Sequence, residues 1–416
     1  MRSGERRLEQ PRASETHAPP PSVTQEAESR LTNHAGTALD GNGAKAPRSA
    51  TCPAFPWSRR GARPGISDIA PAGSGVVQVA KEDGWSLMGV VACTLFEGDY
   101  HQGVGALANS LIAHGYRGIF HVGYRGTLPP WSPWPGATGD RDLQVTPEFV
   151  IRFAEQTTAR HLAAHKPAFV DSLLDAYPEA EGAVYLDPDI VLDCRWSIIE
   201  AWLLCGVPIC EDLRSPLHPT HPARVAWKRI LTEMGLSVCR ETELYANSGF
   251  VGASRANRSF LALFAHVVEE LERLTGLPMV LNRISDGVAR PAGWQPSETT
   301  LIAQDLPTGP WQRFSDQIAF NMAIMCTREP ISVVGPIAMA LVPSPWSFLP
   351  HAIGPDKPWR GCFIWAALLG RPPTIAARAY WRYAHGPIAV HSPLRRLQRW
   401  VDLILGMLIG RFIPRR

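Results

Sequence analysis

Apolar runs of strand length alternate with stretches of helical periodicity over most of the chain. Residues 88–95 form a compact apolar run, residues 104–114 repeat small and aliphatic side chains at helical spacing, and residues 119–124 form a second apolar run. A strand, a helix and a strand in this order predict a β-α-β unit, and such units build parallel sheets covered by helices. We therefore expect an α/β fold with a single Rossmann-like, mostly parallel mixed sheet flanked by helices.

The same alternation continues toward the C-terminus. Helical periodicity predicts helices at about 159–176, 196–205, 259–274 and 316–326, and shorter apolar runs predict strands at 184–192, 207–210 and 245–252. Segments rich in proline and glycine, at 129–136 and about 276–312, are expected to be loops. By contrast, residues 1–80 contain few aliphatic side chains, so we expect a disordered leader there.

Two acidic residues, Asp187 and Asp189, interrupt the apolar run Val184–Leu192. Carboxylates at the end of a buried strand are costly unless a positive charge neutralises them. A divalent cation would do so, because Mg²⁺ and Mn²⁺ prefer carboxylate and phosphate oxygens. The pattern also fits a strand followed by a turn in which aspartate is only a loop or capping residue. At this point both interpretations stay open.

Composition narrows the function classes. Of 416 residues, 45% are hydrophobic and 19% are charged, and the net charge of +3 is too small to predict a nucleic-acid partner. The eight cysteines have no C-x-x-C spacing and most lie in apolar segments, so we expect most of them to be buried thiols in a reducing compartment, and no zinc site. Neither a signal peptide nor a membrane-spanning run is recognisable, and we expect a cytoplasmic location.

A second informative segment is the loop at residues 351–359, which carries His351, Gly354 and Lys357 among prolines. A neutral imidazole can ligate Mn²⁺. The glycine would let the backbone approach a phosphate, and the lysine would supply a positive charge for it. Alternatively, this is a surface turn with a solvated lysine.

Taken together, these pieces resemble the retaining GT-A glycosyltransferases of the glycogenin and galactosyltransferase group, a glycosyltransferase family 8-like pattern. The resemblance covers roughly residues 88–360. It rests on an ordered set of segments: Thr94 with residues 96–100, Lys166, Asp187 with Asp189, Asn247-Ser248-Gly249, Asp316-Gln317 and the loop 351–359. The chain departs from the family at Arg313, where an aspartate would stand, and in a longer stretch between Gly249 and Asp316.

The resemblance implies a nucleotide-diphosphate sugar as donor, with UDP-sugar expected, and transfer with retention to an acceptor of unknown type (glycan, lipid or protein). It implies that Asp187, Asp189 and His351 hold Mn²⁺ or Mg²⁺. Contacts to the nucleotide and its phosphates would come from Thr94, Asp99, Tyr100, Lys166, Gly354 and Lys357. The catalytic residues, which contact the sugar or the acceptor, would be Asn247, Asp316 and Gln317. Ser248 and Gly249 would add further substrate contacts.

Two other functions remain open from the sequence. A nucleotidyltransferase would need a glycine-rich phosphate loop after the first strand, and Gly103-Val104-Gly105 is a poor version of one. A non-catalytic module that binds nucleotide sugars would keep the same segments without turnover.

The expected catalytic domain spans residues 85–365, followed by a helical tail at 366–416. Within the tail, residues 395–416 combine arginines with apolar side chains. This segment could lie on an anionic membrane surface, which would make the protein peripheral on the cytoplasmic face of a membrane. The alternative is a C-terminal helix that docks on the catalytic domain.

Overall fold

The computed structural model describes residues 89–276, 295, 315–354 and 356–413. All of these belong to one compact unit of the chain. The predicted disordered leader at residues 1–80, most of the predicted loop at 276–312, and Arg313 lie outside the described residues.

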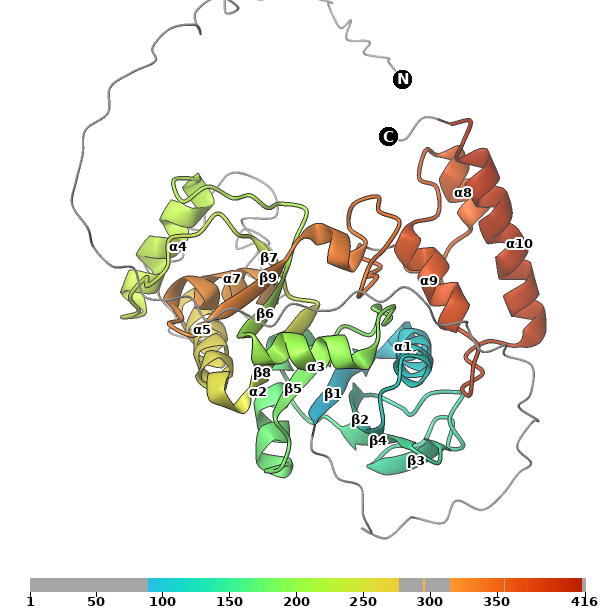
Figure 1. Ribbon diagram of the computed structural model, residues 1–416, viewed down its shortest axis with the longest axis horizontal. Coiled ribbons are helices and arrows are strands. Elements are labelled where there is room, and N and C mark those ends of the chain that lie inside the picture. Colours follow the sequence, from blue (N-terminus) through green and yellow to red (C-terminus); the bar gives the residue numbers. More distant parts are fainter. Residues whose placement is uncertain (1–88, 277–294, 296–314, 355, 414–416) are drawn as a thin grey trace, which may run out of the picture. The chain divides into compact units, whose positions relative to one another are not determined.

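A six-stranded sheet forms the centre of this unit (Figure 1). Its four inner strands are parallel, and one antiparallel strand lies at each edge. The predicted fold class, a mostly parallel mixed sheet flanked by helices, is confirmed. In spatial order the strands are β3 (Arg141–Thr146), β4 (Phe149–Glu155), β2 (Gly118–Arg125), β1 (Val90–Glu97), β5 (Gly182–Leu186) and β8 (Phe250–Ser254).

The central strand β1 aligns its two neighbours. Ala92 pairs with Phe120 of β2 on one side and with Val184 of β5 on the other. Because the three strands are parallel, the segments that follow them leave the sheet at the same edge, where ligands of open α/β sheets bind. The short 3₁₀ helix η1 (Gly98–Tyr100) after β1 and the Asp187–Asp189 segment after β5 therefore lie at one edge.

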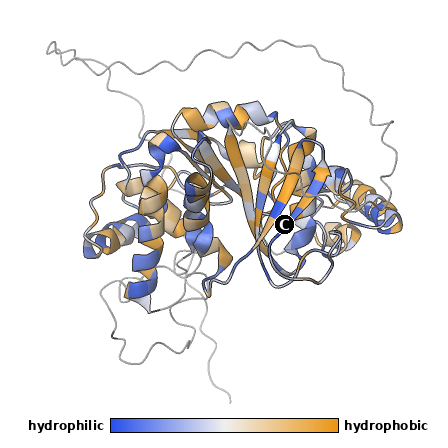
Figure 2. Cartoon of the chain, turned by 90° about the horizontal axis from the view of Figure 1, so that it is seen from below, coloured by the Kyte–Doolittle hydropathy of each residue, from blue (hydrophilic) through white to orange (hydrophobic). Residues whose placement is uncertain are grey.

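Helices cover both faces of the sheet. Helices α2 (Leu162–Ala176) and α5 (Ser259–Thr275) pack with one set of β1 side chains, whereas α1 (His101–Ala113) and α3 (Trp196–Leu204) pack with the alternate set. Successive strand residues point to opposite faces, so a strand covered on both sides is apolar throughout. Figure 2 shows this, since the central strands are mostly in hydrophobic colours.

The strands form two sheets rather than the single one predicted. The second, smaller sheet has the order β7 (Ala246–Asn247), β6 (Val207–Glu211) and β9 (Ile331–Val334). The strand predicted at 245–252 is divided between the sheets, because β7 pairs with β6 while β8 pairs with β5. Ser248 and Gly249 join the two pieces, which places small polar residues at the junction of the sheets.

Most predicted elements are present with shifted ends, and α7 (Asp316–Cys326) has the predicted bounds. The strand predicted at 184–192 is too long, since β5 ends at Leu186 and the following residues make contacts elsewhere. Several elements were not predicted individually. These are β3, β4, β9, α4 (Pro222–Glu233), α8 (Phe363–Leu368), and the 3₁₀ helices η2 (Arg255–Asn257) and η4 (Pro336–Met339). Helix α9 (Ile375–Tyr383) lies within the predicted helical tail.

The C-terminal helices pack outside the central sheet, against α1 and against one another. Helix α9 packs against α1, and α10 (Pro393–Ile409) packs against α8 (Figure 1). Leu403 and Gly406 of α10 are buried. Within the segment 366–416, the described residues include the helices α9 and α10 and the end of α8. Among the described helices, none combines the length and the apolar character needed to cross a bilayer.

Candidate functional site

The Asp187–Asp189 segment and the His351 loop are far apart in the sequence, but their backbones pair. Ile190 and His351 form an isolated antiparallel β-bridge. On either side of it, the Ala352 N–H donates to the Asp189 carbonyl (3.0 Å) and the Val191 N–H donates to the Pro350 carbonyl (3.2 Å). These contacts use backbone groups that would otherwise continue β5, and they bring the two predicted motifs to one place.

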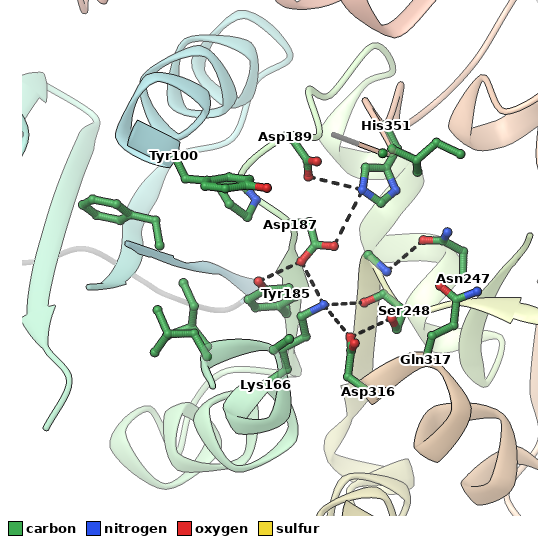
Figure 3. A pocket seen from close by; sticks show the side chains of 18 of the residues that line it. Tyr100, Lys166, Tyr185, Asp187, Asp189, Asn247, Ser248, Asp316, Gln317 and His351 are labelled. Atoms are coloured by element: carbon green, nitrogen blue, oxygen red, sulfur yellow. Dashed lines mark hydrogen bonds and ion pairs between the residues drawn. The ribbon is translucent and has the colours of Figure 1, made fainter. Parts of the chain in front are cut away.

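The side chains of Asp187, Asp189 and His351 point toward one another (Figure 3). The His351 Nε2 lies 3.2 Å from the Asp189 Oδ1 and 3.6 Å from the Asp187 Oδ2. One donor atom from each residue falls within 4.8 Å of the others. Two carboxylates and an imidazole suit Mn²⁺ and can also hold Mg²⁺, which prefers oxygen. The three residues predicted as metal ligands are thus a group that could hold a metal ion.

Gly249 determines where the His351 ring can lie. A Cβ at position 249 would be 2.4 Å from the His351 Cε1 and 2.9 Å from the Asn247 Oδ1. Its carbonyl also accepts a hydrogen bond from the Asp187 N–H (2.8 Å). A residue without a Cβ is therefore needed for the His351 ring to approach at this point.

Gly103 has a comparable effect on the other side of the aspartates. It lies in the first turn of α1, and a Cβ there would be 1.9 Å from the Pro188 carbonyl oxygen. The absence of a side chain lets α1 pack directly on the Asp187–Asp189 segment. Packing therefore explains why residue 103, the first glycine of Gly103-Val104-Gly105, is a glycine.

Lys357 neutralises the second aspartate. Its Nζ contacts the Asp189 Oδ2 and donates to the Ala352 carbonyl (2.8 Å). Burial acts to lower the pKa of Lys357, but the Asp189 carboxylate outweighs it and raises the pKa. For Asp189, burial acts to raise the pKa, and His351 and Lys357 together lower it well below the usual range. Both groups are therefore charged, and the Oδ1 of Asp189 remains directed toward His351.

A buried lysine holds the first aspartate. The Lys166 Nζ lies 2.9 Å from both the Asp187 Oδ1 and the Asp316 Oδ2. Burial acts to lower the pKa of Lys166, but the two carboxylates raise it well above the usual range. The Tyr185 hydroxyl donates to the same Asp187 oxygen (2.9 Å), which leaves the Oδ2 to face His351. Lys166 comes from α2, so that helix ties β5 to the start of α7 (Figure 3).

The junction between β7 and β8 supplies further polar groups. Ser248 donates from its Oγ to the Asp316 Oδ2 (2.7 Å), and its carbonyl accepts from the Lys166 Nζ (3.1 Å). Asn247 donates from its Nδ2 to the Asp212 Oδ2 (2.9 Å). Asp316 stands in the first turn of α7, a favourable place for a carboxylate at a helix N-terminus. Gln317 follows it and also faces the cavity.

Of the predicted nucleotide contacts in and after β1, only Tyr100 lines the cavity, whereas Thr94 and Asp99 make contacts elsewhere. Tyr100 reaches the cavity and packs edge-on against Trp359, with ring centroids 5.5 Å apart. Thr94 is fully buried and donates from its Oγ1 to the Leu186 carbonyl (2.7 Å). Asp99 forms an ion pair with Arg360, which lowers its pKa, and accepts from the Trp359 Nε1 (3.0 Å). Thr94 and Asp99 do not line the cavity in the described residues.

These groups surround one cavity of about 720 Å³, a volume in the usual range for small-molecule sites. The predicted residues that line it are Tyr100, Lys166, Asp187, Asp189, Asn247, Ser248, Gly249, Asp316, Gln317, His351, Gly354 and Lys357. Residues from six separated stretches of the sequence are therefore brought together. How each contacts a ligand stays a prediction.

Several polar residues of the cavity were not predicted. Asp212 follows β6 directly, and the rule that drew attention to Asp187, an acidic residue at the end of an apolar strand, would have found it. Glu97 ends β1 in the same way. Tyr185 lies inside the apolar run and looks like an ordinary core residue in the sequence. His161 and Arg214 carry no local signal, since only the fold places them at the cavity.

Comparison with known proteins gives structural similarities alone. No protein-family profile and no curated protein sequence matches the chain. Among solved structures, the chain is similar to WbbM, a bifunctional glycosyltransferase in its apo form (10% identity, TM-score 0.39), over 76% of this chain and 52% of that one. It is similar to the glycosyltransferase GlyE of Streptococcus pneumoniae TIGR4 (12%, 0.38), over 76% and 65%.

A third similar structure is an active-site mutant of LgtC, at 12% identity and a TM-score of 0.39, over 74% of this chain and 99% of that one. The chain therefore spans about half of the WbbM structure and about two thirds of the GlyE structure.

Proposed function

We propose that the chain is a metal-dependent glycosyltransferase with a GT-A fold, which transfers a hexose from a nucleotide-diphosphate sugar to an acceptor. One observation carries this proposal: Asp187, Asp189 and His351 meet in the same cavity as Lys357 and Gly354, at the carboxyl edge of a parallel sheet. A metal-binding group of two carboxylates and an imidazole next to a buried cation suits a diphosphate, which needs charge neutralisation from more than one side.

In this proposal Asp187, Asp189 and His351 hold Mn²⁺ or Mg²⁺. When bound, such an ion would act as a Lewis acid and neutralise the charge of the leaving nucleoside diphosphate. Lys357 carries a second positive charge at the cavity, and Gly354 leaves room for backbone to approach a phosphate. The Tyr100 ring, which reaches the cavity beside β1, would stack on the base.

The opposite wall of the cavity would take the sugar. Asp316 accepts hydrogen bonds from Lys166 and Ser248, so its carboxylate is fixed in direction. Asn247 is likewise fixed by Asp212. Such preorganised polar groups can bond sugar hydroxyls and stabilise an oxocarbenium-like centre. We propose transfer with retention, in which Asp316 or Gln317 stabilises that centre while the acceptor attacks from the leaving-group side.

Thermal unfolding with UDP, GDP and UDP-sugars tests this function, each with Mn²⁺, with Mg²⁺ and with EDTA. We expect a metal-dependent increase in Tm with a nucleoside diphosphate, and release of nucleoside diphosphate from the sugar donor over time. Asp187→Ala and Asp189→Ala should each remove the metal dependence. As a matched control, Asp140→Ala changes an exposed aspartate that does not line the cavity, and it should keep the metal dependence.

Each alternative function predicts a different result. A non-catalytic module would show the increase in Tm without release of nucleoside diphosphate. A nucleotidyltransferase would instead form pyrophosphate from a nucleoside triphosphate and a sugar phosphate. If no nucleoside diphosphate raises the Tm with any metal, the donor site is wrong.

A further inference from the structure

One face of helix α10 exposes apolar side chains in a continuous stripe. Six of them are between 42% and 65% exposed: Leu394, Leu397, Val401, Ile404, Leu405 and Leu408. At about 100° per residue, these positions fall within an arc of roughly 100° on the helix. Phe412, just after the helix, is 85% exposed. A stripe of this kind is normally buried against another surface.

The opposite face of α10 already has its partner. Leu403 is buried, and a Cβ at Gly406 would be 2.8 Å from the Phe363 carbonyl oxygen of the segment that begins α8. Asp402 also turns toward α8 and accepts hydrogen bonds from the Phe363 and Ile364 N–H groups (3.0 Å and 2.9 Å). The helix is therefore docked on the body by one side, so the exposed stripe is not the docking side.

The charges beside the stripe are positive. Helix α10 and the turn after it contain Arg395, Arg396, Arg399 and Arg411, against the single acidic residue Asp402. That aspartate is paired with Arg399 (3.1 Å). Within the described part of the chain, Arg395, Arg396 and Arg411 form no ion pair. Arg395 and Arg399 turn toward the body, where they donate to the Trp359 and Gly361 carbonyls. The unpaired positive charge beside the stripe therefore comes from Arg396 and Arg411.

We propose that the exposed stripe of α10 docks on an anionic lipid surface, with the helix lying in the plane of the membrane. Apolar side chains on one face and arginines at its margins are the combination that binds a headgroup region, where both are satisfied at once. A second protein copy would bury the stripe but would bring two sets of arginines together. This inference does not depend on the proposed donor site.

The docked face also connects this helix to the cavity. Arg395 donates to the Trp359 carbonyl (3.3 Å), and Trp359 packs against Tyr100. Arg399 donates to the Gly361 carbonyl. The segment that carries Lys357 is thereby fastened to α10, so a membrane-bound helix would hold the cavity at the lipid surface.

Co-sedimentation of the full chain with vesicles tests the proposal. We expect binding to vesicles of phosphatidylcholine mixed with phosphatidylglycerol, weaker binding as salt increases, and little binding to phosphatidylcholine alone. The double variant Leu397→Asp/Ile404→Asp places charges in the stripe and should weaken binding by roughly tenfold or more.

The matched control is Leu204→Asp/Val225→Asp, which makes the same kind of change at exposed positions of α3 and α4. It should bind like the unchanged protein. Circular dichroism and the Tm should be unchanged in both variants, since all four side chains are exposed. The metal-dependent response to a nucleoside diphosphate should also persist in both, which separates failure of this proposal from failure of the donor site.

Three results would overturn the proposal. The first is that the unchanged protein fails to bind the anionic vesicles. The second is that the two double variants bind these vesicles equally well. The third is that light scattering without vesicles finds a dimer that only Leu397→Asp/Ile404→Asp dissociates. The last result would assign the stripe to a second copy of the chain.

Discussion

The cavity and the outer face of α10 break the usual distribution of side chains in opposite ways. The cavity buries charges, with Lys166 only 3% and Lys357 only 7% exposed, while the outer face of α10 exposes leucine and isoleucine. Each buried lysine has a carboxylate partner, so the cavity is complete within the chain apart from its ligands. The stripe has no partner among the described residues. The difference indicates that one region is built by internal contacts and the other is built for an external surface.

The largest effect should come from removing the buried lysine. Lys166→Met leaves Asp187 and Asp316 without their shared cation, and breaking a buried ion pair typically costs about 3–5 kcal/mol. Urea unfolding should show this loss in the free energy of unfolding. Lys228→Met is the matched control, because Lys228 pairs with Glu241 at the surface and such pairs contribute about 0.2–1 kcal/mol. Equal losses in the two variants would mean that the buried network is not needed for stability.

A second comparison lies within α10 itself. Leu403→Ala removes a side chain that is 1% exposed, and truncation of a buried leucine costs about 2–5 kcal/mol. Leu397→Ala makes the same change at a side chain that is 63% exposed and should alter the free energy of unfolding by less than about 0.5 kcal/mol. If Leu397→Ala is the more destabilising variant, the stripe is packed inside the protein and the membrane proposal loses its basis.

The smallest effect concerns the ring that faces the aspartates. Gly249→Ala forces the His351 imidazole to move, and disturbing the groups that orient a metal ligand typically lowers metal affinity by about 10–100-fold. Titration calorimetry with Mn²⁺ measures this. Gly335→Ala is the control, since the nearest atom to a Cβ there is the Glu211 Oε2 at 3.7 Å. Unchanged Mn²⁺ affinity in Gly249→Ala would contradict the role of His351 as a ligand.

The alternation of apolar and polar positions was enough to predict the β-α-β opening and most of the helices. It was less reliable at the ends of strands. Strand β5 stops at Leu186 because the following residues pair with the Pro350–Ala352 segment, which no local pattern reveals. The edge strand β3 was missed because its side chains are half-exposed and its sequence lacks an apolar run.

The candidate site could be predicted only in part, because only some of its residues carry a local signal in the sequence. Residues that follow apolar strands or stand beside glycine and proline, such as Asp187 and Gly354, carry a local signal. Tyr185, His161 and Arg214 carry none, because their place at the cavity depends on which segments lie opposite them. Lys166 was recognised through the resemblance alone, and the structure adds that it bonds Asp187 as well as Asp316.

By itself, the sequence determined the class of the fold, the edge of the sheet where ligands bind and the residue types available for a metal and a diphosphate. It did so because periodicity and residue chemistry are local properties. Only the tertiary structure decided that His351 faces both aspartates, that each lysine is paired with a carboxylate, and which side of α10 is left outside. These depend on contacts between distant segments, such as the bridge from Ile190 to His351, and on which surfaces packing has already covered.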